Sequence, residues 1–244
     1  VTGFPGTQWF SYGEDASIAG NSGVFRPGYH LIGWEDITTG ATYLLGEAIP
    51  TIDRNYSFRA IWELALYNVY YVRGTGDNVE SVPDDALELK YGTTYVISSG
   101  VPYRSGYSFL YWMTSDVTGT ERTYVGGDLI SIPDNNVKLT AVLFAEESAG
   151  YYHSNFGADE KTEGGSFATD SIATVAGNMF SRPGYRFIGW SEKSATASVS
   201  RQPGNTFAMP PRQVNFYAQW QQEFYSVTYY VNGGTGKGMD GATP

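Results

Sequence analysis

The stretch RPGYRFIGW at residues 182–190 decides the fold, because close copies of it recur along the chain. RPGYHLIGW occupies residues 26–34 and RSGYSFLYW occupies residues 104–112, so each copy begins 78 residues after the one before. A fixed spacing of this kind is the signature of a tandem array of small structural units. We therefore predict that the 244 residues form several small domains and not one large one.

The repeated stretch itself predicts a turn followed by a strand. Pro183 fixes φ and Gly184 allows a turn conformation that other residues avoid, and an aromatic strand follows at once. Strict alternation along this strand would place Phe187 on one face and Ile188 with Trp190 on the other. We expect either a strand buried on both faces or one whose Trp caps the edge of the core.

Two further patterns accompany each copy of the anchor. A run rich in Val and Tyr begins at Tyr67 and again at Tyr225, and each run ends in a Gly-rich stretch. A divergent version of the same pattern begins at Ala149. Such a run predicts a strand that enters a turn. Downstream, residues 214–220 alternate apolar and polar side chains, as a strand with one buried face does. Residue 1 already lies in the Gly-rich stretch, so the first copy lacks its opening strand.

These patterns predict a mostly β chain, α+β at most. The one helix candidate is VPDDALELKYG at residues 82–92, with Asp84 or Asp85 as N-cap and Gly92 as the stop. The predicted units are a first repeat at 1–65 without its opening strand, a second at 66–148, a third at 149–223, and the opening of a fourth at 224–244.

Composition excludes several functions. The formal net charge of −10 and the pI near 4.6 make nucleic acids and anionic membranes unfavourable partners. No run approaches the roughly 20 apolar residues that span a bilayer, so no membrane insertion is expected. The absence of cysteine rules out disulfides and thiolate chemistry. The chain opens in mid-repeat without a signal peptide, and we interpret it as a fragment of a longer protein.

The sequence offers no convincing chemical site. Its two histidines, His30 and His153, occupy non-equivalent positions, and neither lies in a recognisable nucleophile motif. Oxygen-rich clusters around Asp84, Asp134 and Asp159 lack the spacing of a calcium loop, and their turn-forming residues explain them adequately. We therefore predict no catalytic, cofactor or metal site, and no enzymatic activity.

Aromatic residues make up 16% of the chain, enough to raise the question of a sugar-binding surface. Those at fixed repeat positions are expected in the cores, because a small core is readily filled by a few large rings. Trp9, Phe10, Tyr12 and Phe156 do not recur, and these four are the candidates for exposure. The sequence does not single out a ligand-binding residue among them.

Together, the ordered motifs resemble a known family. They are similar to the bacterial surface repeat of the Listeria/Bacteroides type, related to the B repeat of internalin. The matching elements are, in order, a Val/Tyr-rich strand that leads into NGGTG or RGTG, then RPGYxFxGW, a variable loop, GxxFxMP and VxFYAxW. The resemblance covers three copies and a partial fourth, and implies small β-grasp-like domains in series. The middle copy departs from it at Ser105 and Tyr111, which puts the same turn and edge packing there in question.

The resemblance implies a non-enzymatic extracellular segment at the bacterial cell surface or cell wall. We expect it to act as a stalk that presents another domain, with adhesion to a host glycan or protein, or an accessory role in a secreted enzyme, as alternatives. A further hypothesis is head-to-tail association, in which residues 225–231 complete the first unit of a neighbouring molecule. The alternative is that this strand lies upstream in a longer array.

Overall fold

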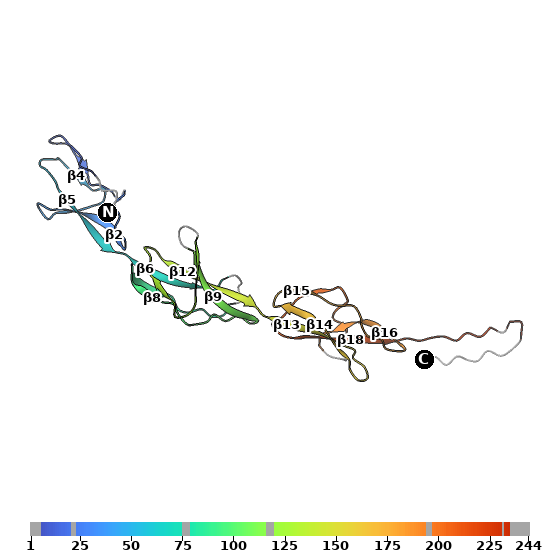
Figure 1. Cartoon of the computed structure of the whole chain (residues 1–244). Helices are drawn as coiled ribbons and strands as arrows, with labels where there is room; N and C mark the ends of the chain where they lie inside the picture. Colours follow the sequence, from blue (N-terminus) through green and yellow to red (C-terminus); the bar gives the residue numbers. More distant parts are fainter. Residues whose placement is uncertain are drawn as a thin grey trace. The chain divides into compact units, whose positions relative to one another are not determined.

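The computed structural model of the chain describes residues 6–20, 23–74, 79–115, 120–193, 197–230 and 232–234 (Figure 1). These residues form strands, turns and loops, and no helix occurs among them. The prediction of a mostly β chain is therefore confirmed. The chain divides into two compact units, Val1–Phe144 and Ala145–Pro244.

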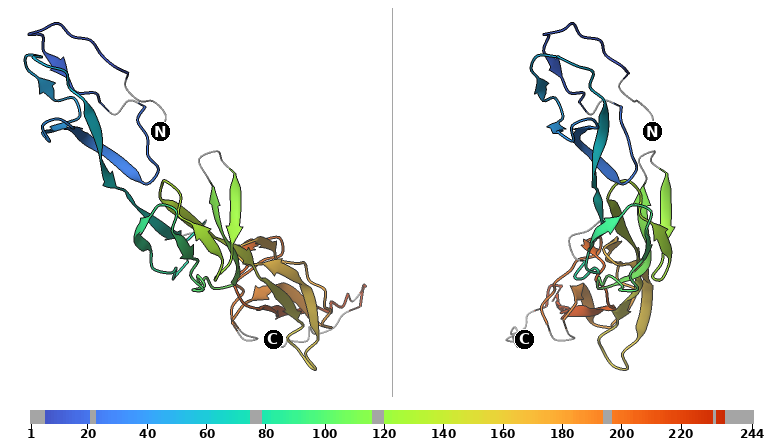
Figure 2. Two further views of the ribbon diagram at one scale, coloured as in Figure 1. Left: turned by 60° about the vertical axis from the view of Figure 1, so that its left-hand side comes forward. Right: turned by 90° about the vertical axis from the view of Figure 1, so that its left-hand side faces the viewer.

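Strands β1 to β12 belong to the first two repeats, and Figure 2 shows the teal strand β5 beside the blue strand β2. In space they form the sheets β3-β2-β5 and β10-β9-β12-β6-β7 and the two-stranded pairs β1-β4 and β11-β8. Their bounds are β1 (Ala16–Ser17), β2 (Tyr29–Asp36), β3 (Thr42–Leu44), β4 (Ala48–Ile49), β5 (Phe58–Leu64), β6 (Leu66–Val72), β7 (Ala86–Lys90), β8 (Thr94–Val96), β9 (Tyr107–Ser115), β10 (Glu121–Tyr124), β11 (Leu129–Ser131) and β12 (Val137–Ala145).

The second unit contains the sheet β14-β13-β18-β16 and the pair β15-β17. Its strands are β13 (Glu147–His153), β14 (Lys161–Ala168), β15 (Ile172–Thr174), β16 (Tyr185–Ser191), β17 (Thr206–Ala208) and β18 (Val214–Gln222). The arrangement matches that of the second repeat. In both, the first and last strands lie side by side and run parallel, with Val137 opposite Val69 in one and Val214 opposite Gly150 in the other.

The repeated anchor forms the same tight turn in all three copies. The backbone N–H of the tyrosine donates to the carbonyl of the arginine at 3.1 Å, and the intervening glycine has φ between 74° and 77°. The guanidinium lies 3.7–3.8 Å above the centroid of the same tyrosine ring, a cation–π contact. Ser105 in the middle copy therefore supports the same turn as proline, because the glycine supplies the positive φ.

A β-bulge after the turn places the tryptophan in the core. The pairing of β16 with β18 shifts between Phe187 and Gly189, so the side-chain alternation resets there. As a result Trp190 is fully buried, its ring lies 4.9 Å from that of Phe187, and Ile188 points outward. The predicted strict alternation was therefore wrong, since Phe187 and Trp190 share the core face.

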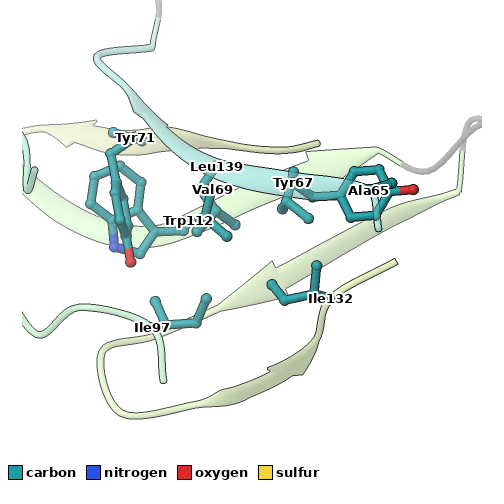
Figure 3. Close-up of a cluster of buried hydrophobic side chains, with 10 residues drawn as sticks. Ala65, Tyr67, Val69, Tyr71, Ile97, Trp112, Ile132 and Leu139 are labelled. Atoms are coloured by element: carbon teal, nitrogen blue, oxygen red, sulfur yellow. The ribbon is translucent and has the colours of Figure 1, made fainter. Parts of the chain in front are cut away.

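Each tryptophan of the anchor lies at the centre of a separate buried cluster. Figure 3 shows the second of these clusters, with Tyr71 beside Trp112 and with Val69 and Leu139 next to them. The Tyr71 and Trp112 rings meet edge to face at 4.9 Å. Trp34 and Trp190 hold the same place in the other two clusters. The prediction that recurring aromatic residues fill small cores is therefore confirmed for the three anchor tryptophans.

The predicted helix at residues 82–92 is a strand. Residues 86–90 form β7, an antiparallel partner of β6, and Leu89 packs against the second core. Asp85, a proposed N-cap, instead accepts a hydrogen bond from the backbone N–H of Tyr71 at 2.9 Å. Pairing with a neighbouring strand and burial of one face outweigh the weak helix propensity of this segment.

Candidate functional site

The two histidines do not form a catalytic arrangement. His30 is exposed on β2. His153 lies 2.7 Å from Asp159 through Nδ1 and 3.1 Å from Asn215 through Nε2. The adjacent hydroxyl is that of Ser154, which is fully buried and accepts a hydrogen bond from the Glu160 N–H at 2.9 Å. These contacts close the loop after β13, and the hydroxyl faces no open space in which a substrate could bind.

The most buried carboxylate of the first repeat belongs to Asp36, and it is held by an ion pair. It accepts hydrogen bonds from the Thr38 N–H and the Thr39 hydroxyl, each at 2.9 Å, and from the guanidinium of Arg54. The bond from Arg54 lowers the pKa of Asp36 to about 2, although burial opposes this change. A carboxylate kept ionised in this way cannot donate a proton near neutral pH.

The predicted oxygen-rich clusters do not converge on a metal site. In the part of the chain that the structure describes, no group of three or more His, Cys, Asp or Glu side chains could hold an ion. Asp84 is exposed, and Asp159 takes part in the loop closure around His153. Asp134 has a different role, at the junction between the first two repeats.

That junction is a polar contact within the first unit. The carboxylate of Asp134 accepts a hydrogen bond from the backbone N–H of Gly28 at 2.8 Å and another from the hydroxyl of Tyr67. Burial and then the bond to Asp134 raise the pKa of Tyr67 to about 12. In addition, the Ala65 N–H donates to the Gly28 carbonyl at 2.9 Å. Gly28 of the first anchor turn is therefore bonded through its N–H to Asp134 of the second repeat and through its carbonyl to Ala65, the residue just before β6.

A close approach accompanies these bonds. A Cβ atom placed on Gly28 would lie 2.6 Å from the Cβ of Tyr91, which is nearer than carbon atoms can pack. Glycine is required here for two reasons, its positive φ of 77° and the proximity of the next repeat. Gly184 has the same conformation, but nothing lies within 4 Å of the corresponding position. Sequence reasoning missed this difference, because the two turns have the same local sequence.

Three of the four predicted exposed aromatics lie on the surface of the first repeat. Trp9 is 90% exposed and Tyr12 is 85% exposed, and Phe10 is exposed to a lesser degree. Phe156 is different, since its ring packs edge to face on Trp220 at 5.6 Å. The prediction that Phe156 is exposed was wrong, because the loop that carries it folds back on β18.

A hollow lies beside these aromatic residues in the first repeat. Its volume is about 690 Å³, and Trp34, Tyr56 and Phe58 form part of its wall. Trp9 and Phe10 also line it. Sequence analysis did not identify this cavity. Its lining residues come from stretches that are separate in the sequence, between residues 6 and 58, so no local pattern signals it.

Comparison with known proteins places the repeats in a family. Residues 67–142 match the Listeria-Bacteroides repeat domain and residues 158–224 match the divergent InlB B-repeat domain. A protein of Evansella cellulosilytica described as "Putative membrane protein" is 30% identical over 205 residues, covering 80% of this chain and 28% of that protein. A second, "Putative Gly-rich membrane protein" of the same organism, is 29% identical over 163 residues, covering 63% and 18%.

The chain therefore spans less than a third of the length of either relative. In the described part of the chain, nothing forms a helix of the length and apolarity that a bilayer crossing needs. The second and third copies of the anchor fall inside the two family matches, whereas the first is assigned by its motif. The chain thus carries tandem repeats of the Listeria-Bacteroides and divergent InlB B-repeat type.

Proposed function

We propose that this chain is a non-enzymatic spacer that presents another part of a longer protein at the bacterial surface. The membership of its repeats in a surface-protein family supports this role, and so do the membrane-protein descriptions of its two relatives. Its conspicuous polar clusters all serve folding or the junction between repeats. In tandem-repeat proteins each repeat contacts mainly the repeats next to it in the sequence, which suits a spacer.

The observation that carries the proposal is the parallel pairing of the first and last strands in a repeat. In the second repeat, β6 and β12 are direct neighbours, with four paired positions from Val69 opposite Val137 to Val72 opposite Thr140. Tension on the two ends of the repeat pulls these strands along each other in opposite directions. All the hydrogen bonds between them then bear the force together, and the third repeat has the same arrangement in β13 and β18.

The junction in the first unit supports the same role. A single residue, Ala65, separates β5 from β6, and its N–H is bonded to Gly28. With Asp134 bonded to the same glycine, no free linker remains between the first two repeats to act as a hinge. A spacer requires this property, because a flexible connection shortens the average distance between its ends.

Force spectroscopy on the second repeat tests the proposal. The chain has no cysteine, so pairs of cysteines can serve as specific attachment points. Leu66→Cys with Phe144→Cys places the attachments at the start of β6 and near the end of β12, where both side chains are exposed. We expect a high rupture force from this pair, because pulling shears the parallel strands.

The matched control is Leu66→Cys with Lys90→Cys. These two residues face each other in the antiparallel pair of β6 and β7, so the same force opens one hydrogen bond at a time. The control should rupture at a clearly lower force at the same pulling speed. If the rupture force of the first pair is no higher than that of the control, the parallel strands do not resist shear, and the spacer proposal loses its main support.

Adhesion is a second candidate function, favoured by the exposed rings of Trp9 and Tyr12. Flat aromatic surfaces of this kind can stack on sugars or anchor a protein partner. Binding of the whole chain to an array of glycans and extracellular-matrix proteins tests this function. A saturable signal lost in both Trp9→Ala and Tyr12→Ala, and retained in Tyr230→Ala as a similarly exposed control, would establish adhesion.

A further inference from the structure

The contact between the first and last strands of the third repeat continues past the end of their pairing. β13 and β18 pair in parallel over four positions, from Gly150 opposite Val214 to His153 opposite Tyr217. After His153 the chain leaves the sheet and forms the loop that leads to β14. The first residues of this loop stay against the last positions of β18, so the two strands remain joined beyond their paired region.

Three contacts make this extension, which we call the clasp. The Nε1–H of Trp220 donates to the Ser154 carbonyl at 2.8 Å. The Nδ2–H of Asn155 donates to the Ala218 carbonyl, also at 2.8 Å. The ring of Phe156 packs edge to face on that of Trp220 at 5.6 Å. The clasp therefore adds two hydrogen bonds and one ring contact to the backbone pairing of β13 with β18.

The loop is itself held closed, so the clasp can transmit force. One carboxylate oxygen of Asp159 accepts a hydrogen bond from the Asn155 N–H at 2.9 Å, and the other lies 2.7 Å from Nδ1 of His153. The Ser154 N–H donates to the Glu160 carbonyl at 2.8 Å, and the Ser154 hydroxyl accepts from the Glu160 N–H at 2.9 Å. Because the two ends of the loop are bonded to each other, the loop cannot peel away from β18 without opening these bonds as well.

The second repeat lacks the two side chains that donate the hydrogen bonds of the clasp. By the register of the parallel pairs, Gly74 corresponds to Asn155 and Leu143 corresponds to Trp220. Glycine has no side-chain amide, and leucine has no N–H donor in its side chain. A Cβ atom placed on Gly74 would lie 2.2 Å from the Ala141 carbonyl oxygen, so the backbone passes this carbonyl too closely for any side chain. The two repeats therefore share the parallel strands and differ in the clasp.

We propose that the clasp makes the third repeat the stronger of the two under tension, so that a stretched chain lengthens by opening the second repeat first. This inference rests on the proposed spacer role, because it concerns a chain under tension. Tension on the two ends of a chain passes through every repeat, and the repeat with the weaker shear contact opens earlier. The clasp lies near the end of β18, where the force enters that strand, so it must break before β13 and β18 can slide apart. Opening of the second repeat relieves the tension and leaves the third repeat folded.

Measurements of rupture rate at constant force on the whole chain test the clasp. Glu147→Cys with Gln221→Cys places the attachments at the positions equivalent to Leu66 and Phe144, where both side chains are exposed. We expect the third repeat to rupture about tenfold more slowly than the second, since two additional hydrogen bonds must break. Equal rates for the two repeats, with both slower than the control pair of Leu66→Cys and Lys90→Cys, would overturn the clasp and leave the spacer proposal intact.

Two tryptophans provide matched variants within the third repeat. Trp220→Phe removes the N–H of the clasp and keeps an aromatic ring, and we expect it to raise the rupture rate at constant force about fivefold. Trp190→Phe also removes an indole N–H, but one that is bonded to the Ala176 carbonyl at 3.0 Å and takes no part in the contact between β13 and β18. It should change the rupture rate less than about twofold, although it lowers the free energy of unfolding. If both variants raise the rupture rate equally, the effect is one of overall stability and the assignment of the clasp is wrong.

Pulling across both repeats tests the order of opening. Leu66→Cys with Gln221→Cys should give two rupture events, of which the earlier is the opening of the second repeat. Trp220→Phe should therefore shorten the wait for the later event and leave the earlier one unchanged. Asn155→Gly should act in the same way, because it removes the other hydrogen bond of the clasp and glycine adopts the φ of 58° without strain. A change in the earlier event, or no change in either, would contradict the proposal.

Discussion

Replacing the anchor glycine by alanine should have unequal effects in two turns with the same local sequence. Gly28 and Gly184 have φ of 77° and 74°, so either substitution forces alanine into a left-handed conformation. This costs about 1–2 kcal/mol, partly offset because alanine restricts the unfolded chain. For Gly184→Ala nothing else opposes the new methyl group, and we expect a net loss of about 1 kcal/mol.

Gly28→Ala adds a steric conflict. The new Cβ would lie 2.6 Å from the Cβ of Tyr91, an atom fixed to the backbone that cannot rotate away. Overpacking of this kind costs about 1–3 kcal/mol. Relief of the contact would displace the Gly28 N–H from Asp134, and a hydrogen bond to a charged group contributes about 1.5–3 kcal/mol. The expected total is about 2–4 kcal/mol, because either the steric conflict or the loss of the hydrogen bond adds to the backbone cost of about 1 kcal/mol.

Hydrogen exchange with mass spectrometry measures both effects, because it resolves the opening free energy of each strand. Peptides that contain β2 report on Gly28→Ala and peptides that contain β16 report on Gly184→Ala. Peptides from β7 should also lose protection in Gly28→Ala, because Tyr91 directly follows this strand. Equal losses in the two variants, with β7 unchanged, would refute the proposed contact between the first and second repeats.

Three more predictions concern single side chains. Asp134→Ala should lower the opening free energy at the junction of the first two repeats by about 1–3 kcal/mol, as measured by hydrogen exchange in β6, with Asp84→Ala as an exposed control. Trp190→Phe should be more destabilising than Trp112→Phe by about 1 kcal/mol in urea unfolding, because Trp190 Nε1 donates a hydrogen bond and, in the described structure, Trp112 Nε1 has no partner. A larger loss for Trp112→Phe would contradict this reasoning. The contribution of Tyr67, whose folded pKa is raised to about 12, should be fully present below pH 10 and lost as pH rises toward 12, and Tyr67→Phe should remove this alkaline step from the urea midpoint.

Sequence reasoning predicted those features that depend on local conformation and strict periodicity. The anchor turn follows from Gly184, and the burial of Val214, Phe216 and Ala218 follows from their alternation along β18. It failed where distant contacts decide the outcome. Residues 86–90 are a strand because β6 lies beside them, and Trp190 faces the core because a bulge resets the alternation.

Prediction of the candidate sites likewise succeeded where local sequence was sufficient and failed where distant contacts were needed. Exposure of Trp9 and Tyr12 was predicted from their failure to recur along the chain. The junction carboxylate of Asp134 was noticed only as part of a turn-forming cluster, since its partners are far away in the sequence. The pocket beside Trp34 could be found only from the structure, because its lining residues come from separate stretches of the sequence. Repeat boundaries at 65, 148 and 223 remain predictions.

The three anchor turns also differ in their vulnerability to proteolysis. Proteases of the trypsin type cut after arginine but not where proline follows, so the bonds after Arg26 and Arg182 are protected by their chemistry. The bond after Arg104 leads to Ser105 and has no such protection, and it depends on the fold, in which the guanidinium is stacked on Tyr107. Transient opening of the middle turn therefore exposes a cleavable bond that the other two turns lack. Where such enzymes are present, the lifetime of the chain is set in part by how rarely this turn opens.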